Sequence, residues 1–242
     1  MLSGRASSPP LGSTALGSTT SFGSSSNHTT AAPADGFEIS IEELCDLLSL
    51  QRSVRLDTPE KIKADWSARL RRLEVRDLEK SENRYAYALD TQRGRQIIAI
   101  RGTANLANAL LDLESWKDKS PVLGIKLHHG FEKAASIVYE DARQYLDFKL
   151  PVVVCGHSLG AAEAIILGML LSKAGYRVEK ILASGPPKVT DAEGVAAYAK
   201  LPVVLVTAAF DPVPFLPPAL LYPGKPFVQW GPLLMLLDGP CV

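Results

Sequence analysis

The apolar and polar residues of this chain follow two periods, which predict helices and strands in turn from residue 37 onward. Apolar residues at helical spacing predict a helix that begins after Ser40, where Ser40 and Glu43 form a capping box. Thr58 followed by Pro59 predicts the start of a second helix, because a hydroxyl residue caps a helix and proline suits its first turn.

Short apolar runs between polar turns predict the strands of the chain, and longer periodic runs predict its helices. Strands are expected at residues 84–89, 96–101, 125–128, 151–155, 180–184 and 202–208, with helices at 131–145 and 158–174. The charge run at residues 69–80 is interpreted as a solvated face and turn. Strands that alternate with helices over short connections indicate an α/β fold whose mostly parallel or mixed sheet is covered on both faces.

One folded domain and one tail account for the full length of 242 residues. This length suffices for one well-filled α/β domain and is too short for two large ones. Residues 1–36 are low in complexity and rich in serine, threonine and glycine. Such a segment buries too little apolar area to offset the entropy of ordering it. We therefore expect a disordered tail at residues 1–36 and a folded domain at residues 37–242.

The pentad Gly156-His157-Ser158-Leu159-Gly160 is the strongest motif for chemistry. It lies between a predicted strand and a predicted helix, the context in which G-x-S-x-G indicates a nucleophilic serine. On such a sharp turn the serine hydroxyl is exposed at the end of a sheet, and the two glycines remove Cβ atoms that would clash. The alternative is a glycine-rich turn with an incidental serine, which the flanking strand and helix disfavour.

A nucleophilic serine also needs a base, an acid that orients the base, and donors for the oxyanion. Asp211 is the leading acid because it follows a predicted strand, and strand ends place side chains at the edge where the nucleophile lies. A turn-forming Asp-Pro is the alternative, and Asp191 is the second candidate acid. The N–H of Leu159 and the N–H and O–H of Thr103 are the candidate oxyanion donors, although Gly102-Thr103 also fits an ordinary strand end.

Residues 97–233 resemble the fungal-type, or class 3, lipases. The resemblance rests on five segments in the same order: residues 100–103 (IRGT) with Asp112-Leu113 downstream, 128–131 (HHGF), 156–162 (GHSLGAA), 184–189 (SGPPKV), and 211–214 (DPVP) with 216–218 (LPP). Five ordered matches are far more specific than any one of them.

This resemblance implies an α/β-hydrolase-like three-layer sandwich with a mostly parallel central sheet, and hydrolysis of carboxylic esters that are often lipids. It implies Ser158 as the nucleophile, Asp211 as the acid, and Thr103 and Leu159 as oxyanion donors. By the same resemblance His128 and His129 are architectural, and the His157 side chain is expected to point away from the reacting centre. Residues 104–119 fit a lid over the pocket and an ordinary buried helix equally well.

The catalytic histidine of that family follows the acid, but the 31 residues after Asp211 contain none. Gln229 lies in a segment where family members often carry a histidine that is not the base, and glutamine cannot accept a proton near neutral pH. Three accounts stand open. The reading frame stops early and truncates the domain; the chain binds acyl or lipid ligands without turnover; or His128 or His129 replaces the base.

Composition excludes other classes of function. Lysine plus arginine and aspartate plus glutamate each total 26, so no strong field recruits nucleic acid. The sequence has no H-E-x-x-H, no clustered cysteine and histidine, and no phosphate-binding loop, so no metal or cofactor is implied. No apolar stretch approaches the roughly 18 residues that span a bilayer, and no secretory signal is evident, so localisation stays open. The expected partner is a small ester or lipid substrate, with transient contact to a lipid interface.

Overall fold

The computed structural model describes residues 39–79, 83–102, 119–218, 226–231 and 233–236. The expected tail at residues 1–36, Thr103, and nearly all of the segment 104–119 lie outside the described residues. Among the described residues, no helix is long and apolar enough to cross a membrane.

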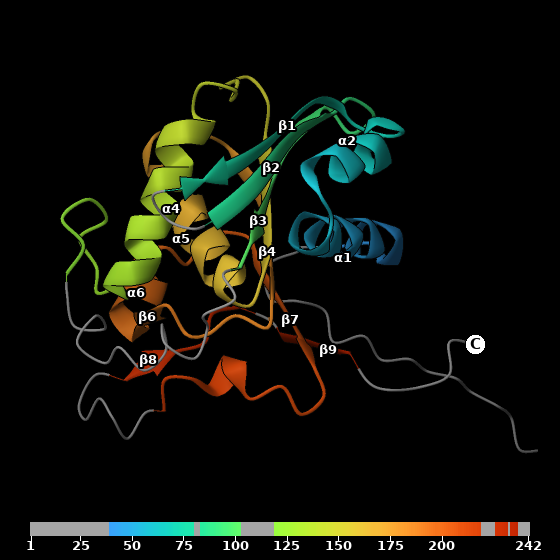
Figure 1. Ribbon diagram of the computed structural model, residues 1–242. Helices are drawn as coiled ribbons and strands as arrows, with labels where there is room; N and C mark the ends of the chain where they lie inside the picture. The colour runs from blue at the N-terminus through green and yellow to red at the C-terminus, as the bar shows by residue number, and fades with distance from the viewer. Residues whose placement is uncertain (1–38, 80–82, 103–118, 219–225, 232, 237–242) are drawn as a thin grey trace, which may run out of the picture. The chain divides into compact units, whose positions relative to one another are not determined.

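A seven-stranded sheet forms the centre of the fold, as the alternating pattern predicts (Figure 1). Its strands, in spatial order, are β1 (Arg71–Leu78), β2 (Asn83–Asp90), β3 (Arg95–Arg101), β4 (Val152–His157), β5 (Val178–Ser184), β7 (Val203–Ala208) and β9 (Leu233–Leu236). β1, β2 and β3 pair antiparallel, and every pair from β3 to β9 is parallel. A second sheet pairs β6 (Thr190–Asp191) with β8 (Phe227–Val228). The α/β prediction is therefore confirmed.

Helices cover both faces of the sheet. The helices α1 (Ile41–Leu56) and α2 (Pro59–Ser67) lie on one face, while α4 (His129–Ala142) and α5 (Leu159–Lys173) lie on the other (Figure 1). A short helix, α6 (Ala192–Ala197), follows β6. α1 and α2 begin where the caps predict, because the Ser40 hydroxyl accepts the Glu43 N–H and the Thr58 hydroxyl accepts the Lys61 N–H.

Two expectations for local structure are wrong. The charge run at residues 69–80 contains the edge strand β1, whose charges remain partly solvated while its backbone pairs with β2. Edge strands tolerate charged residues because one side of the strand faces water. The expected strand at residues 125–128 is reduced to two isolated bridges, which join Lys126 to Lys119 and Leu127 to Thr190.

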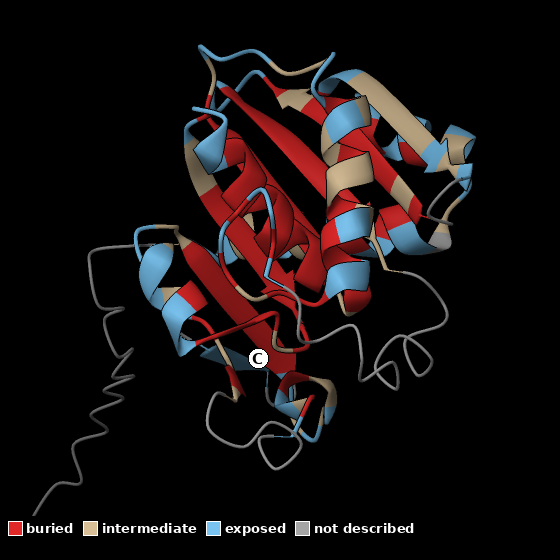
Figure 2. Ribbon diagram, turned by 90° about the vertical axis from the view of Figure 1, so that its left-hand side faces the viewer, coloured by how far each residue is buried: buried red, intermediate tan, exposed pale blue. Residues whose placement is uncertain are grey.

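The alternation of side chains along each strand divides the core into two layers, one on each face of the sheet. The central strands are coloured mainly as buried in Figure 2. In β4, Val152 and Val154 pack with α4 and α5, while Val153 and Cys155 pack with α1 and α2. The same alternation assigns His157, the last residue of β4, to the α1 side. α5 is buried from Leu159 to Leu171 because it lies between the sheet and α4.

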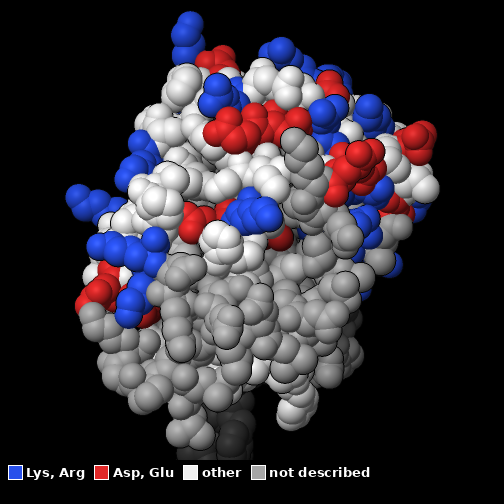
Figure 3. Space-filling view, turned by 60° about the vertical axis from the view of Figure 1, so that its left-hand side comes forward, with Lys and Arg blue, Asp and Glu red and all other residues white. Residues whose placement is uncertain are grey.

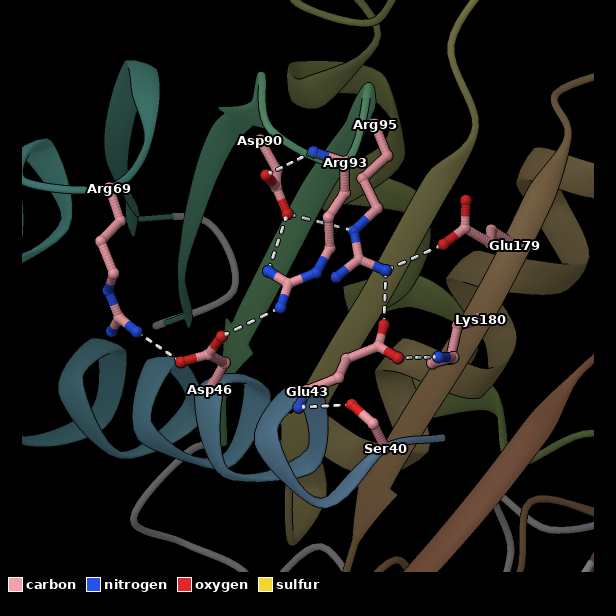
Figure 4. A network of polar contacts seen from close by, with 9 residues as sticks. All are labelled: Ser40, Glu43, Asp46, Arg69, Asp90, Arg93, Arg95, Glu179 and Lys180. Carbon is pink, nitrogen blue, oxygen red and sulfur yellow. Dashed lines mark hydrogen bonds and ion pairs between the residues drawn. The ribbon is translucent and has the colours of Figure 1, made fainter. Parts of the chain in front are cut away.

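A network of ion pairs joins the start of α1 to the sheet (Figure 4). Glu43 accepts hydrogen bonds from Arg95 on β3 and from Lys180 on β5, each at 2.5 Å. Arg95 also pairs with Asp90 and Glu179. Burial alone would raise the pKa of Glu43, but the hydrogen bonds from Lys180 and Arg95 outweigh it, so this pKa lies below its ordinary value.

The next turn of α1 extends this network, because Asp46 pairs with Arg69 and with Arg93. On the face seen in Figure 3, basic and acidic side chains are interspersed over the described surface, in keeping with the equal totals of the two charges.

Candidate active site

The candidate nucleophile lies on the turn between β4 and α5. Ser158 has φ 56° and ψ −122°, a positive φ that L residues rarely adopt. Its hydroxyl makes no capping bond to α5, and its N–H donates to the Ser184 carbonyl oxygen at 2.8 Å. The serine is therefore held by its backbone, while its side chain is not used to cap the helix.

Glycines make this turn possible because the backbone passes close to itself. A Cβ on Gly156 would lie 2.1 Å from the Gly160 carbonyl oxygen, and a Cβ on Gly160 would lie 2.6 Å from the Ile100 carbonyl oxygen. A Cβ on Gly102 would lie 3.3 Å from the Leu159 nitrogen, so the end of β3 lies against the start of α5. Thr103, the next residue, is outside the described residues. Leu159 is the first residue of α5, so its N–H has no partner within the helix.

Asp211 lies at the same edge of the sheet, three residues beyond the end of β7. Its Oδ1 accepts the Val213 N–H at 3.0 Å. Gly185 follows β5 with φ 56°, and a Cβ there would lie 2.6 Å from Asp211 Oδ2. Because Ser184 also binds the Ser158 N–H, the segment Ser184-Gly185 contacts both the candidate nucleophile and the candidate acid.

The second candidate acid has a different position. Asp191 caps α6, and its Oδ1 accepts the Gly194 N–H at 3.0 Å. It lies in β6, which pairs with β8 outside the main sheet. Its Oδ2 is buried without a hydrogen-bond partner. Asp191 is therefore engaged as a helix cap. Asp211 is the carboxylate that lies at the edge of the main sheet where the turn between β4 and α5 carries Ser158.

His157 faces α1, as the strand alternation requires. Its Nδ1 lies 3.3 Å from the Arg55 guanidinium. A guanidinium can only donate, so Nδ1 accepts and the ring proton is on Nε2. Burial and the charge of Arg55 lower the pKa of His157, and the Asp211 carboxylate opposes them. His157 and Asp211 line one cavity of about 360 Å³, together with Arg52 and Arg55.

Two further histidines lie at the start of α4, His128 as its N-cap and His129 as its first residue. His128 is buried, and its Nδ1 accepts the Phe131 N–H at 3.3 Å as the helix cap. Its ring also stacks on Phe131 with centroids 3.9 Å apart. His129 is the first residue of α4 and is exposed. His128 thus has a clear architectural role in starting α4.

Two polar contacts of the fold were not anticipated from the sequence. Glu163 is 1% exposed on α5, and burial raises its pKa to about 8 although a hydrogen bond from the Asn83 amide opposes the rise. Gln229 donates to the carbonyl oxygens of Pro186 and Pro214, and so touches the loop that carries Asp211. The only signals in the sequence are a charge inside an apolar helix and a polar residue after a short apolar run.

Among the described residues, no group of acidic, histidine and cysteine side chains is placed to hold a metal ion.

Comparison with known proteins gives one consistent result. Residues 97–221 match the family "Lipase (class 3)". A lipase from Rhizopus niveus is 30% identical over 159 residues, which are 59% of this chain and 40% of that lipase. Human diacylglycerol lipase-alpha is 30% identical over 153 residues, which are 55% of this chain and 14% of that protein. The chain thus spans less than half the length of these curated relatives.

Solved structures agree on the fold. The triacylglyceride lipase of Rhizomucor miehei aligns with a TM-score of 0.58 and 22% identity, covering 75% of this chain and 77% of that one. A mutant of MDLA from Penicillium cyclopium aligns with a TM-score of 0.61 and 21% identity, covering 85% and 84%. At these identities the likeness establishes the α/β-hydrolase fold.

Proposed function

This chain belongs to the class 3 lipase family, and on that premise we propose that it hydrolyses carboxylic esters with Ser158 as the nucleophile and Asp211 as the acid. The observation that carries the proposal is the positive φ of Ser158 on the turn between β4 and α5. A serine holds this conformation where the surrounding fold imposes it, and the turn directs its hydroxyl to the carboxyl edge of the sheet.

In the proposed reaction, Ser158 Oγ attacks the ester carbonyl carbon while its proton passes to a base. The carbonyl oxygen becomes an oxyanion, for which the Leu159 N–H and the Thr103 N–H and O–H are the proposed donors. Collapse of the tetrahedral intermediate expels the alcohol with that proton and leaves the acyl group on Ser158, and water then releases the acid. The N-terminus of α5 adds its dipole to the stabilisation of the negative charge.

We propose acylglycerols or other lipid esters as the substrates, reached by transient contact with a lipid interface. The names of the relatives, lipase and diacylglycerol lipase-alpha, support this class. Two exposed aromatic side chains support the contact, since Phe210 is 99% exposed and Phe215 is 70% exposed. Both lie within four residues of Asp211, and exposed apolar side chains beside a site suit a lipid surface.

The question of which group takes the Ser158 proton favours one alternative function. His128 and His157 both use Nδ1 as an acceptor, for the Phe131 N–H and for Arg55, so neither takes the Ser158 proton at that atom. Gln229 has no nitrogen that accepts a proton. Removing one member of a serine triad lowers kcat by about 10⁴-fold or more. The alternative is therefore a lipase-like domain that binds acyl or lipid ligands without turnover.

A fluorophosphonate probe distinguishes the two functions, because it forms a covalent bond only with an activated serine. We expect labelling that disappears in Ser158→Ala and slows in Asp211→Asn, accompanied by hydrolysis of p-nitrophenyl butyrate by the unmodified chain. Binding of a fluorescent fatty acid without labelling or hydrolysis would instead support the non-catalytic alternative.

A further inference from the structure

The loops around Asp211 are rich in proline and therefore short of backbone donors. Residues 186–187 follow β5 as Pro-Pro, and residues 212–218 contain four prolines among seven residues. Proline has no N–H, so these loops have few backbone donors for one another's carbonyl oxygens, and one backbone bond joins them, from the Lys188 N–H to the Leu216 carbonyl oxygen. Carbonyl oxygens that are buried away from water need hydrogen-bond donors from other parts of the chain. At this edge of the sheet, side chains supply several of these donors.

The Gln229 amide serves both loops at once. Its Nε2 donates to the Pro186 carbonyl oxygen at 2.9 Å and to the Pro214 carbonyl oxygen at 2.7 Å. A primary amide nitrogen carries two N–H groups, so one side chain bridges the loop after β5 and the loop after β7. Pro214 is buried and lies three residues from Asp211.

Lys188 makes a second bridge between the same loops. Its Nζ donates to the carbonyl oxygens of Phe215 at 3.0 Å and Pro217 at 3.2 Å, and its backbone N–H donates to the Leu216 carbonyl oxygen at 2.8 Å. Burial lowers the pKa of Lys188, and among the described residues no carboxylate pairs with it. This cation is thus held on backbone carbonyls that belong to the loop of Asp211.

We propose that Gln229 and Lys188 are positioning residues that fix the carboxylate of Asp211 at the site, and we call this pair the loop clamp. The inference rests on the proposed role of Asp211 as the acid. One end of the loop is held by β7 and the other by the loop clamp, so Asp211 lies between two anchored points. The recess at Gly185 and the Val213 N–H then define where its two carboxylate oxygens lie.

The loop clamp explains why glutamine serves at position 229. A neutral histidine carries a single ring N–H, so it donates to one of the two carbonyl oxygens and turns its other nitrogen, a lone pair, elsewhere. The amide donates to both. Gln229 therefore does not stand in for a missing base; it holds the acid instead. Its contribution to the reaction is made through Asp211 and not by contact with the substrate.

Amide hydrogen exchange of Val213 measures the positioning directly, because that N–H is bonded to Asp211 Oδ1. We expect Gln229→Leu to speed Val213 exchange at least about fivefold, the factor that corresponds to losing one net hydrogen bond. Gln229→His should restore part of the protection because it keeps one donor. Gln144→Leu is the matched control, since Gln144 is exposed just after the end of α4 and donates its amide to the Asp141 carbonyl oxygen.

A second readout links the loop clamp to chemistry. If Gln229 acts through Asp211, Gln229→Leu slows fluorophosphonate labelling in the unmodified chain but has no further effect in Asp211→Asn. Unchanged Val213 exchange in Gln229→Leu would overturn the inference. Equal acceleration of the β4 amides would also overturn it, because it would show a general loss of stability. An unlabelled chain would contradict the proposed function alone, while Val213 exchange would still decide the role of Gln229.

Discussion

Replacing Glu163 with glutamine removes a carboxyl group that is buried on α5, five residues after the candidate nucleophile. The side chain is 1% exposed, and its pKa in the folded chain is about 8 against an ordinary value of 4.5. The folded state therefore binds this proton more tightly than the unfolded state does. Consequently the free energy of unfolding falls as pH rises from about 4.5, and it levels off above about pH 8.

The size of the effect follows from the two pKa values. Each pH unit between them costs about 1.4 kcal/mol, and with partial titration near pH 8 the loss from pH 6 to pH 8.5 is about 2 to 3 kcal/mol. A glutamine at position 163 still accepts the Asn83 hydrogen bond but has no proton to lose. Glu163→Gln should therefore remove this part of the pH dependence. As pH rises, the free energy of unfolding of Glu163→Gln should increase relative to that of the unmodified chain.

Urea unfolding followed by tryptophan fluorescence at pH 6, 7 and 8.5 provides the assay. Glu140→Gln is the control, because Glu140 is an exposed carboxylate on α4. Its pH profile should follow that of the unmodified chain. If Glu163→Gln retained the full pH dependence, the carboxyl group would already be ionised in the folded chain, and the reasoning from burial would be refuted.

Three further predictions concern the elements around the site. Glu43→Gln should lower the free energy of unfolding by about 3 kcal/mol, because it leaves buried Arg95 without one of its carboxylates. The exposed control Glu42→Gln should lower it by less than about 1 kcal/mol, and urea unfolding measures both. Gly160→Ala places a Cβ 2.6 Å from a backbone oxygen, so it should slow fluorophosphonate labelling at least about tenfold and lower the melting temperature. His157→Gln keeps an acceptor for the Arg55 guanidinium, so labelling should change less than about fivefold; a loss of about 100-fold or more would identify His157 as the base.

Local signals explain what the sequence predicts well. Ser40 and Thr58 cap their helices with their own side chains, and the turn at Ser158 is marked by glycines two residues to either side, so short stretches of sequence suffice to predict these features. The orientation of His157 toward α1 also follows from strand alternation once its strand is identified. Predictions of this kind depend on residues that are close together in the chain.

Contacts between distant segments explain what the sequence could not supply. The two hydrogen bonds that the Gln229 amide donates depend on three loops that meet only after the sheet has formed. The pKa of Glu163 depends on the helix and strands that surround it, which composition does not reveal. The strand at residues 71–78 was missed because an edge strand lacks the continuous apolar run that marks a central one.

The two edges of the main sheet differ in a way that bears on handling the protein in solution. β1 carries arginines and acidic residues, but β9 carries four apolar side chains that are each between 37% and 56% exposed, and among the described residues only β7 pairs with it. An apolar strand with an open edge is a template for pairing with another molecule. Concentrated stocks should therefore aggregate through Leu233–Leu236, and light scattering should fall when Met235 is replaced by lysine.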